Sequence, residues 1–419
     1  MDTGATYEVK DLQLAGQGEQ NIGYAESQMA ALLTIKERFS RERTLAGLRI
    51  GMALHVTKET AVLVRTLMAG GAEVAITGCN PLSTQDDAAA ALAKSGVRVW
   101  AYKGETVADY YRYLTNVIKT EPHITIDDGC DLISEIHAKH PQLLPKLLGG
   151  CEETTTGVNR LRAMQAANAL KYAVVAVNDN KTKHLFDNYY GTGQSTFDGL
   201  LRATNLLIAG RTVVVAGYGS CGRGVALRAK GLGADVIVTE VDPFRALQAR
   251  MDGHRVMPMA DAAAAGDVFV TVTGNKHVLR PEHFERMKSG VVLANSGHFD
   301  VEIDVKGLKA LAASVRRIRP SLDEYALRDG RKLYVAGEGR LVNLAAAEGH
   351  PSTVMAMSFC GQALAVEFVA KQKLAPGVHT LPERIDQEIA LLQLKALGLR
   401  IDAMTPEQAA YAKSWQEGT

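Results

Sequence analysis

The sequence has no long run of like charges and no excess of either sign. Its 47 Lys and Arg residues nearly balance its 46 Asp and Glu residues, so the formal net charge is +1 at pH 7. Such a surface has no basic stripe that would attract a phosphate backbone or an anionic membrane. We therefore expect neither nucleic acid nor a membrane as the main partner.

Long hydrophobic runs and paired cysteines are also missing. No apolar run reaches the roughly 18 residues of a membrane span, and residues 1–23 lack the basic start and apolar centre of a signal peptide. The 5 cysteines are scattered and form no CxxC pair. An odd number of cysteines without a recurring spacing is typical of reduced thiols, so we expect a cytoplasmic protein.

A glycine-rich turn lies in the middle of the chain. The β-branched run Thr212–Ala216 leads into Gly217, Gly219 and Gly222, and a second apolar run ends at Glu240. In dinucleotide-binding domains the first glycine permits the tight turn, the second lets the backbone approach a pyrophosphate, and the third lets the helix pack on the strand. The acid accepts a hydrogen bond from the ribose 2′-OH. The pattern predicts a dinucleotide site.

Glu240 and Arg245 bear on which dinucleotide is bound. Arg245 could pair with the 2′-phosphate of NADP, but Glu240 would repel that phosphate, so the pair favours NAD. NADP remains the alternative. A glycine turn in a ligand-free α/β domain is the structural alternative.

Strand-like and helix-like segments alternate on both sides of this turn. With 419 residues the chain is too long for one ordinary core. The βαβ rhythm predicts an α/β protein with two doubly wound parallel-sheet domains and a short helical C-terminal segment. The expected strands are 48–54, 72–77, 97–102, 124–126, 173–177, 212–216, 234–240, 267–273, 290–294 and 332–336. The expected helices include 25–39, 61–69, 86–94, 107–119, 156–170, 351–371 with Ser352 as its cap, and the segment from Pro382.

Polar residues follow the expected strands of the first domain. Because ligands bind outside the carboxyl ends of parallel strands, these clusters should surround one pocket. Each cluster alone has a plain structural interpretation, such as a helix cap or a turn. Together they favour a small polar substrate. The clusters are His55–Thr60, Asn80–Asp86, Asp127–Asp128, Cys151–Thr156 and Asn178–Lys183.

The residues of these clusters, with later motifs, resemble the S-adenosyl-L-homocysteine hydrolase (adenosylhomocysteinase) family over nearly the whole chain. The matching segments are His55-Val-Thr-Lys-Glu-Thr-Ala-Val-Leu, Cys79-Asn-Pro-Leu-Ser-Thr-Gln-Asp-Asp, Asp127-Asp-Gly-Cys-Asp, Glu152-Glu-Thr-Thr-Thr-Gly-Val, Phe186-Asp-Asn, Ala216-Gly-Tyr-Gly, Gly297-His-Phe-Asp-Val-Glu-Ile-Asp, Gly339-Arg-Leu-Val-Asn-Leu and Gly349-His-Pro-Ser.

The resemblance implies reversible hydrolysis of S-adenosyl-L-homocysteine to adenosine and homocysteine with a tightly held NAD⁺. In the family the 3′-OH is oxidised, homocysteine leaves by elimination, water adds, and the hydride returns. The implied domains are residues 1–185 for substrate, completed by 350–380, residues 186–349 for NAD, and the helical segment 381–419. The implied assembly is a homotetramer in the cytoplasm.

The resemblance also implies roles for individual residues. The implied catalytic residues are His55, Asp128, Glu153, Lys183, Asp187 and His298, with Lys183 expected to have a lowered pKa so that it can accept the 3′-OH proton. The implied substrate contacts are Thr57, Glu59, Thr60, His350, Met355 and Phe359. The implied NAD contacts are Thr154, Thr155, Thr156, Asn188, Gly217, Gly219, Gly222, Glu240, Arg245 and Asn343. No metal is expected, although His137 and His140 have a spacing that would suit one on a helix.

The sequence departs from the family pattern in places. It ends at Trp415–Thr419 without a tail carrying Lys and Tyr, so we expect no cross-subunit clamp of that kind on the cofactor. Thr192 stands where many members have a Cys, and Glu348 where a Met is common. Three other functions stay open: an S-inosylhomocysteine hydrolase, a catalytically silent NAD-bound homologue, and a 2-hydroxyacid dehydrogenase.

Overall fold

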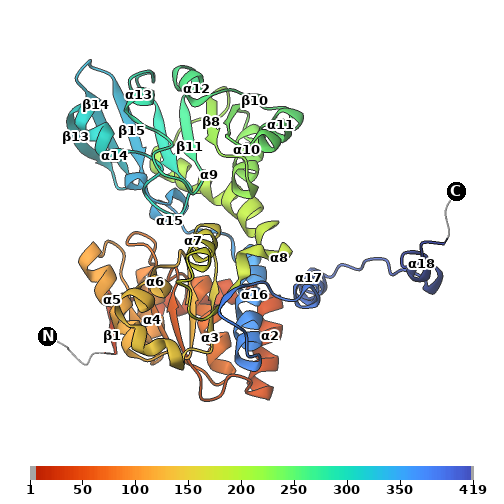
Figure 1. Cartoon of the computed structure of the whole chain (residues 1–419). Helices are drawn as coiled ribbons and strands as arrows, with labels where there is room; N and C mark the ends of the chain where they lie inside the picture. Colours follow the sequence, from red (N-terminus) through yellow and green to blue (C-terminus); the bar gives the residue numbers. More distant parts are fainter. Residues whose placement is uncertain (1–5, 417–419) are drawn as a thin grey trace.

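The computed structural model describes residues 6–416, which form two lobes and a C-terminal arm (Figure 1). Each lobe is built on an 8-stranded sheet, with strand orders β1-β4-β3-β2-β5-β6-β7-β16 and β10-β9-β8-β11-β12-β15-β14-β13. The predicted α/β class with two doubly wound sheets is confirmed. The start of the predicted first domain (residues 1–5) and the end of the predicted C-terminal segment (residues 417–419) lie outside the described residues.

The first lobe holds one sheet and the helices around it. Its strands are β1 (Tyr7–Glu8), β2 (Arg49–Ala53), β3 (Glu73–Thr77), β4 (Arg98–Trp100), β5 (Ile124–Asp127), β6 (Gly149–Glu152), β7 (Ala173–Ala176) and β16 (Gly377–His379). Its helices are α1 (Ala15–Ser27), α2 (Ala30–Glu42), α3 (Lys58–Ala69), α4 (Asp86–Lys94), α5 (Val107–Lys119), α6 (Asp131–Lys139), α7 (Thr155–Ala166), α8 (Lys181–His184), α16 (Ser352–Lys371) and α17 (Glu383–Ala396).

The second lobe lies above the first in Figure 1. Its strands are β8 (Thr212–Ala216), β9 (Asp235–Thr239), β10 (Arg255–Val256), β11 (Val268–Thr271), β12 (Val292–Asn295), β13 (Ala312–Arg319), β14 (Leu322–Leu327) and β15 (Lys332–Ala336). Its helices are α9 (Thr192–Thr204), α10 (Ser220–Gly231), α11 (Pro243–Met251), α12 (Met259–Ala265), α13 (Pro281–Phe284), α14 (Val305–Leu311) and α15 (Val342–Ala345). Helix α18 (Pro406–Tyr411) lies in the arm.

Both faces of the central strands of each sheet are buried, as parallel strands require. In β8, Val213 and Val215 pack into one core cluster, whereas Val214 between them packs into another. All pairs in the first sheet are parallel, while β14 runs antiparallel to β13 and β15 at one edge of the second. Strands with both faces covered read as continuous apolar runs, which is why they could be predicted.

Helix α16 returns the chain from the second lobe to the first. The expectation that no run reaches the length of a membrane span is wrong for this helix, which is 20 residues long and apolar enough to cross a membrane by length and composition. However, 72% of its most apolar window is buried inside the protein. It packs against α2 and α3 in the hydrophobic core of the first lobe. Its apolar character therefore comes from burial in the core.

Some expected elements differ in the structure. The predicted helix 25–39 is wrong as a single helix: residues 25–27 end α1 and residues 30–39 belong to α2, with Gln28 and Met29 between them. Ser352 does not cap α16: Pro351 occupies the cap position, and the Ser352 hydroxyl donates to Glu59 Oε1 at 2.6 Å. Helix α7 ends before 170, where Asn168 adopts a left-handed conformation with φ 54. β13 was not predicted, and most of it is exposed.

Candidate active site

A cleft of ≈ 1190 Å³ lies between the two lobes, at the carboxyl ends of both sheets. It is larger than the roughly 300–1,000 Å³ of a pocket for one small ligand, so it has room for a dinucleotide and a second molecule. The strand order reverses between β2 and β5 and between β8 and β11, and both reversals open on this cleft. All the predicted site residues line it except Gly222.

The glycine turn has the geometry that its sequence predicts. Gly217 has φ +103, a conformation that favours glycine. A Cβ on Gly222 would lie 2.0 Å from the carbonyl oxygen of Gly217, so only glycine lets α10 approach β8. Gly219 lines the cleft, and a Cβ there would meet only Arg245, with Nη1 at 3.5 Å. The glycine turn therefore leaves space for a ligand at Gly219, whereas the space at Gly222 is filled by the backbone of the turn.

Glu240 lies at the end of β9 and is fixed by backbone groups. Its carboxylate accepts hydrogen bonds from the N–H of Tyr218 at 2.7 Å and of Val241 at 2.7 Å. It lines the cleft together with Arg245. An acid held at this edge suits a ribose diol and opposes a 2′-phosphate, so the site is complementary to NAD rather than NADP.

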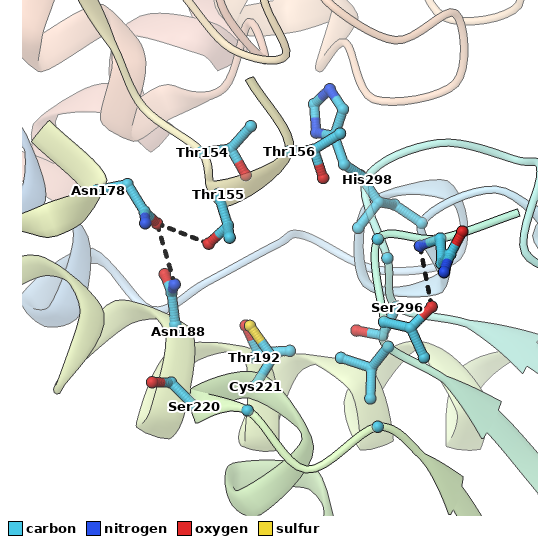
Figure 2. Close-up of a pocket in the computed structure, with 18 of the residues that line it drawn as sticks. Thr154, Thr155, Thr156, Asn178, Asn188, Thr192, Ser220, Cys221, Ser296 and His298 are labelled. Carbon is cyan, nitrogen blue, oxygen red and sulfur yellow. Dashed lines mark hydrogen bonds between the residues drawn. The ribbon is translucent and has the colours of Figure 1, made fainter. Parts of the chain in front are cut away.

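The first lobe supplies hydroxyl and amide groups opposite the glycine turn (Figure 2). Thr154, Thr155 and Thr156 lie at the start of α7, across the cleft from Ser220 and Cys221. Asn178 Oδ1 accepts hydrogen bonds from Thr155 Oγ1 at 3.0 Å and from Asn188 Nδ2 at 3.1 Å. These contacts fix the side chains that face a ligand from the far side.

A buried amide oxygen marks one end of the cofactor cleft. Asn343 Nδ2 donates to Ser195 Oγ at 3.1 Å, but Asn343 Oδ1 is buried with no hydrogen-bond partner. An unpaired buried acceptor costs free energy until a donor reaches it. The amide N–H₂ of a nicotinamide is such a donor, so the cradle, Glu240 and Asn343 together fit NAD.

The His350 ring lies near this amide. Its Nδ1 is 2.9 Å from Ser195 Oγ, and its Nε2 is 3.5 Å from Asp187 Oδ1 and 3.3 Å from Thr192 Oγ1. Gly191 leaves room for the ring, because a Cβ there would lie 2.6 Å from His350 Cδ2. The ring thus lies beside Asp187, and a contact of His350 with adenine stays a prediction.

Lys183 is buried among acceptors at the centre of the cleft. Its Nζ lies 3.1 Å from Asp187 Oδ1, 2.7 Å from Asn188 Oδ1 and 3.7 Å from Glu153 Oε1. The short helix α8 places Lys183 one turn before Asp187, which explains why the two side chains meet. The cluster holds a proton donor and two carboxylates at one point.

The expectation of a lowered pKa for Lys183 is wrong for this arrangement. Burial lowers the pKa of the ammonium, but the carboxylates of Asp187 and Glu153 outweigh burial and raise it above its usual value. The pKa of Asp187 is correspondingly lowered: burial raises it, and the charge of Lys183 more than compensates. Lys183 is therefore an ammonium here.

Glu153 is held by two residues of α16 that the sequence analysis did not identify. Ser358 Oγ donates to Glu153 Oε1, and Gln362 Nε2 donates to Oε2 at 2.5 Å. Burial raises the pKa of Glu153 to about 7, although Lys183 opposes this. A carboxyl with this pKa can give or take a proton near neutrality. The polar pair at i, i+4 on an apolar helix was a signal available in the sequence.

His55, Asp128 and His298 form a second cluster across the lobes. His55 Nε2 is 3.4 Å from Asp128 Oδ2, and His298 Nδ1 is 3.5 Å from Asp128 Oδ1. Gly129 makes room for the second ring, since a Cβ there would lie 2.2 Å from His298 Nε2. One carboxylate thus links an imidazole from each lobe.

Ser83 and Cys79 hold the far side of the His55 ring. Ser83 Oγ lies 2.8 Å and Cys79 Sγ 3.2 Å from His55 Nδ1. Burial lowers the pKa of His55 to about 4, although Asp128 raises it. The imidazole is therefore neutral at pH 7 and can accept a proton.

Two buried carboxyls at the ends of β5 and β6 were not identified as functional from the sequence. Asp127 Oδ2 accepts from the N–H of Ile133 at 2.8 Å, and Glu152 Oε1 accepts from Gly129 N at 2.9 Å and Thr154 N at 3.0 Å. They lie side by side in register on β5 and β6. Each directly precedes a predicted catalytic acid, so each fixes the loop that places that acid.

The end of the cleft formed by α3 and α16 combines helix caps and apolar walls. Thr57 Oγ1 accepts from Thr60 N at 3.3 Å and so caps α3, which is the plain structural role for this residue. Glu59 is buried, and Lys58 Nζ lies 3.4 Å from its Oε1. Met355 and Phe359 line the cleft from α16.

The His137 and His140 pair does not form a metal site. His137 Nδ1 donates to Ile133 O at 2.7 Å, and its Nε2 accepts from Lys171 N at 3.0 Å, so both ring nitrogens are engaged. Within residues 6–416, the group of ligating atoms close enough to hold a metal is His55, Asp128 and His298, all within 4.8 Å of one another. The five cysteines are free thiols.

Comparison with known proteins agrees with this site. Residues 188–349 match the family model described as "S-adenosyl-L-homocysteine hydrolase, NAD binding domain", and residues 6–142 match that described as "S-adenosyl-L-homocysteine hydrolase". The first match covers the glycine turn, which confirms the prediction of NAD as the cofactor at the level of the family.

Close relatives span almost the whole chain. It is 59% identical over 415 residues to the S-inosyl-L-homocysteine hydrolase of Methanocaldococcus jannaschii, covering 99% of this chain and 100% of the relative. It is 58% identical over 416 residues to the adenosylhomocysteinase of Aquifex aeolicus and 57% identical over 415 residues to that of Sulfurisphaera tokodaii, each with 99% and 100% covered. The chain therefore belongs to the S-adenosyl-L-homocysteine hydrolase family.

Proposed function

We propose that the protein splits S-adenosyl-L-homocysteine reversibly into adenosine and L-homocysteine. The observation that carries the proposal is the meeting of two proton-transfer clusters beside a dinucleotide cradle. One cluster surrounds Lys183, and the other surrounds Asp128. An ordinary dehydrogenase needs only one of them, whereas removal of a 5′-thioether needs proton transfer at two places on the ribose.

The first cluster handles the 3′-OH. NAD⁺, when bound, supplies a reversible acceptor for the hydride on C3′. Lys183 and Asp187 orient the hydroxyl, and Glu153 holds the neighbouring ribose oxygen. Since Lys183 is an ammonium in this arrangement, a cationic ring bound beside it would lower its pKa and so let Lys183 Nζ accept the hydroxyl proton.

The second cluster serves C4′ and C5′. Asp128 takes the 4′-proton once the 3′ carbon is a ketone, and the C5′–S bond breaks with its electron pair leaving on sulfur. His298 supplies a proton to that sulfur, and His55 takes one from water as the water oxygen bonds to C5′. A neutral His55 suits the water step, because it starts with a free lone pair.

The remaining predicted residues position the two ligands. Thr154, Thr155, Thr156, Asn188 and the residues of the second lobe hold NAD. Thr57, Thr60, Met355 and Phe359 hold the nucleoside. We assign substrate binding to residues 1–185 with 350–380, and NAD binding to residues 186–349.

Glu59 supports adenine as the base. Its Oε1 is engaged by Ser352, and its Oε2 is left to accept from the exocyclic amine. One close relative is named S-inosyl-L-homocysteine hydrolase, and hypoxanthine carries a carbonyl in place of the amine. A comparison of kcat/KM for adenosine and inosine in the synthetic direction tests the choice; a higher value for inosine contradicts it.

Two measurements test the function itself. Purified protein with S-adenosyl-L-homocysteine and adenosine deaminase should release homocysteine thiol, with boiled protein as the control. Addition of adenosine alone should produce the near-ultraviolet band of reduced nicotinamide. Release of thiol without that band, or the band without thiol, contradicts the combined proposal.

We also propose a cytoplasmic homotetramer that binds small molecules. Exposed apolar residues on the arm and on α11, such as Met404, Phe244 and Met251, support association of chains. Light scattering coupled to size exclusion tests this; a monomer at micromolar concentration contradicts it.

A further inference from the structure

We propose that Glu152 is a positioning residue that fixes the two catalytic clusters relative to each other. This inference rests on the proposed function and adds to it a residue outside the cleft. Glu152 is the last residue of β6, and its side chain is fully buried. It does not line the cleft, so it acts only through the loops that it holds.

One oxygen of Glu152 joins the two loops that carry catalytic acids. Its Oε1 accepts hydrogen bonds from Gly129 N at 2.9 Å and from Thr154 N at 3.0 Å. Gly129 directly follows Asp128, the acid of the second cluster. Thr154 directly follows Glu153, which belongs to the first cluster. A displacement of this one oxygen would therefore move both acids at once.

Gly129 is also the place where the second lobe meets the first. It has φ +104, a conformation that favours glycine, and a Cβ there would lie 2.2 Å from His298 Nε2. Its N–H donates to Glu152 and its carbonyl oxygen accepts from Arg160 Nη1, so the peptide groups on both sides of its Cα are fixed. His298 Nδ1 lies 3.5 Å from Asp128 Oδ1 at this point. Glu152 thus also supports the contact between the lobes.

Gly157 provides the space for the Glu152 carboxyl group. A Cβ at residue 157 would lie 2.1 Å from Glu152 Cδ and 2.4 Å from its Oε2. Gly157 lies in the first turn of α7, whose cap residue Thr154 makes no side-chain cap hydrogen bond. Glu152 accepts from the N–H of Thr154 instead. The acid therefore fits beside the start of α7 because residue 157 is glycine.

Only one oxygen of Glu152 is engaged by the protein. Its Oε2 is buried with no hydrogen-bond partner. Burial raises the pKa of Glu152 well above its usual value, and the charges of Asp127 and Asp128 raise it further, although the N–H groups of Gly129 and Thr154 oppose this. The carboxyl group therefore carries a proton near neutral pH. Its function is to accept through Oε1, which the side chain of glutamine can also do.

Two partial reactions test the two clusters separately. Reduction of the nicotinamide by adenosine requires the first cluster, and exchange of the 4′-hydrogen with deuterium from the solvent requires the second. The exchange is measured on a complex whose nicotinamide is already reduced, so that a slow first step does not limit it. Glu152→Ala should slow both reactions about 100-fold, because a displacement of about 1 Å at a reacting group costs that much.

Conservative variants separate positioning from stability. Glu152→Gln should keep both rates within about five-fold of wild type, because its Oε1 can accept from both N–H groups. Glu152→Met keeps the volume but has no such acceptor, so it should be as slow as Glu152→Ala and replaces that variant if it folds poorly. Both rates are divided by the amount of folded protein from circular dichroism. A residue needed only for stability would lower that amount and leave the rate per folded molecule unchanged.

Asp127→Ala separates the two loops. Its carboxylate accepts from the N–H of Asp128 at the end of β5 and of Ile133 in α6, so the variant should slow exchange more than reduction. Glu73→Ala is the matched control, because Glu73 is an exposed acid of β3 that pairs with Arg98 at 3.4 Å, and it should change neither rate. Loss of only one rate in Glu152→Ala and Glu152→Met, or an equal loss in Glu152→Gln, overturns the proposal.

Failure of this role differs from failure of the proposed function. If wild-type protein does not reduce its nicotinamide with adenosine, the proposed function fails. If wild type does so, and Glu152→Ala and Glu152→Met react at the wild-type rate in both partial reactions, only the role of Glu152 is wrong.

Discussion

At the scale of single residues, the buried ammonium of Lys183 decides how the first cluster works. Its partners Asp187 and Glu153 lie 3.1 and 3.7 Å away, and they keep it charged despite burial. A group of this kind is a proton donor until another positive charge enters the cleft. Its role therefore depends on what is bound beside it.

The first prediction concerns Lys183→Ala. The variant should still bind adenosine, but reduction of its nicotinamide by adenosine should slow by about 100-fold or more, the usual loss for a proton-transfer group. Stopped-flow absorbance measures this rate. Lys181→Ala is the matched control, because Lys181 lies on the same helix but is exposed and pairs with Glu383. Reduction at the wild-type rate in Lys183→Ala refutes the assignment.

The second prediction concerns His55 and pH. Burial lowers the pKa of His55 to about 4 from 6.5, so below pH 6.5 the unfolded chain takes up a proton that the folded chain refuses. Stability contributed by neutral His55 is present above pH 6.5 and is lost as pH falls toward 4. The resulting loss in the free energy of unfolding reaches about 3 kcal/mol once the pH is below 4.

Urea unfolding of wild type and His55→Gln at several pH values measures this effect. The variant lacks the titrating group, so its free energy of unfolding relative to wild type should rise as the pH falls from 6.5 to 4. Glu153, whose pKa is raised to about 7, contributes with the opposite sign in both proteins and cancels in the difference. A difference that does not change with pH contradicts the lowered pKa.

At the scale of elements, helix α10 shows why the glycine positions differ in importance. Gly222 faces the turn and has no room for a Cβ, whereas Gly231 at the end of the same helix has nothing within 4 Å. The two positions separate the packing role of glycine from its effect on helix propensity.

The third prediction follows from this contrast. Gly222→Ala should push α10 from β8 and weaken NAD binding at least ten-fold, because the Cβ would lie 2.0 Å from Gly217 O. Gly231→Ala should bind NAD as wild type does and be slightly more stable. Fluorescence titration of the apoprotein with NAD measures both. Equal affinity in the two variants would disprove the close packing.

Some elements and boundaries could be predicted from local sequence, and others could not. The central strands could be predicted, because buried parallel strands read as apolar runs. The break at Gln28–Met29 could not, because the apolar spacing continues from α1 into α2. β13 could not either: it is mostly exposed and lies at the sheet edge, so its strand state depends on pairing with β14.

At the scale of the whole molecule, contacts across the lobes accompany the assembled site. Lys103 Nζ from the first lobe donates to Leu344 O at 3.3 Å and Ala345 O at 3.0 Å in the second. Lys58 and Arg202 both pair with Glu348, at 3.0 and 3.2 Å. These contacts surround residues 343–352, where the chain passes from the second lobe back to the first.

The fourth prediction concerns closure. Adenosine should reduce the radius of gyration in small-angle scattering, because Asp128 and His298 come from different lobes and meet only when the lobes are together. Lys103→Ala should weaken adenosine binding about 5- to 20-fold by removing hydrogen bonds of a charged donor. Lys94→Ala, at an exposed position, is the control. An unchanged radius with and without adenosine contradicts closure.

The sequence by itself determined the sheets, the glycine cradle and the polar residues at the strand ends, because these depend on periodicity and on residue types next to each other in the chain. The tertiary structure alone decided the pairings across lobes. The pairing of Asp128 with His298 and the charged state of Lys183 depend on distances between segments far apart in sequence. Electrostatic interactions and burial act through space, so no local pattern could fix them.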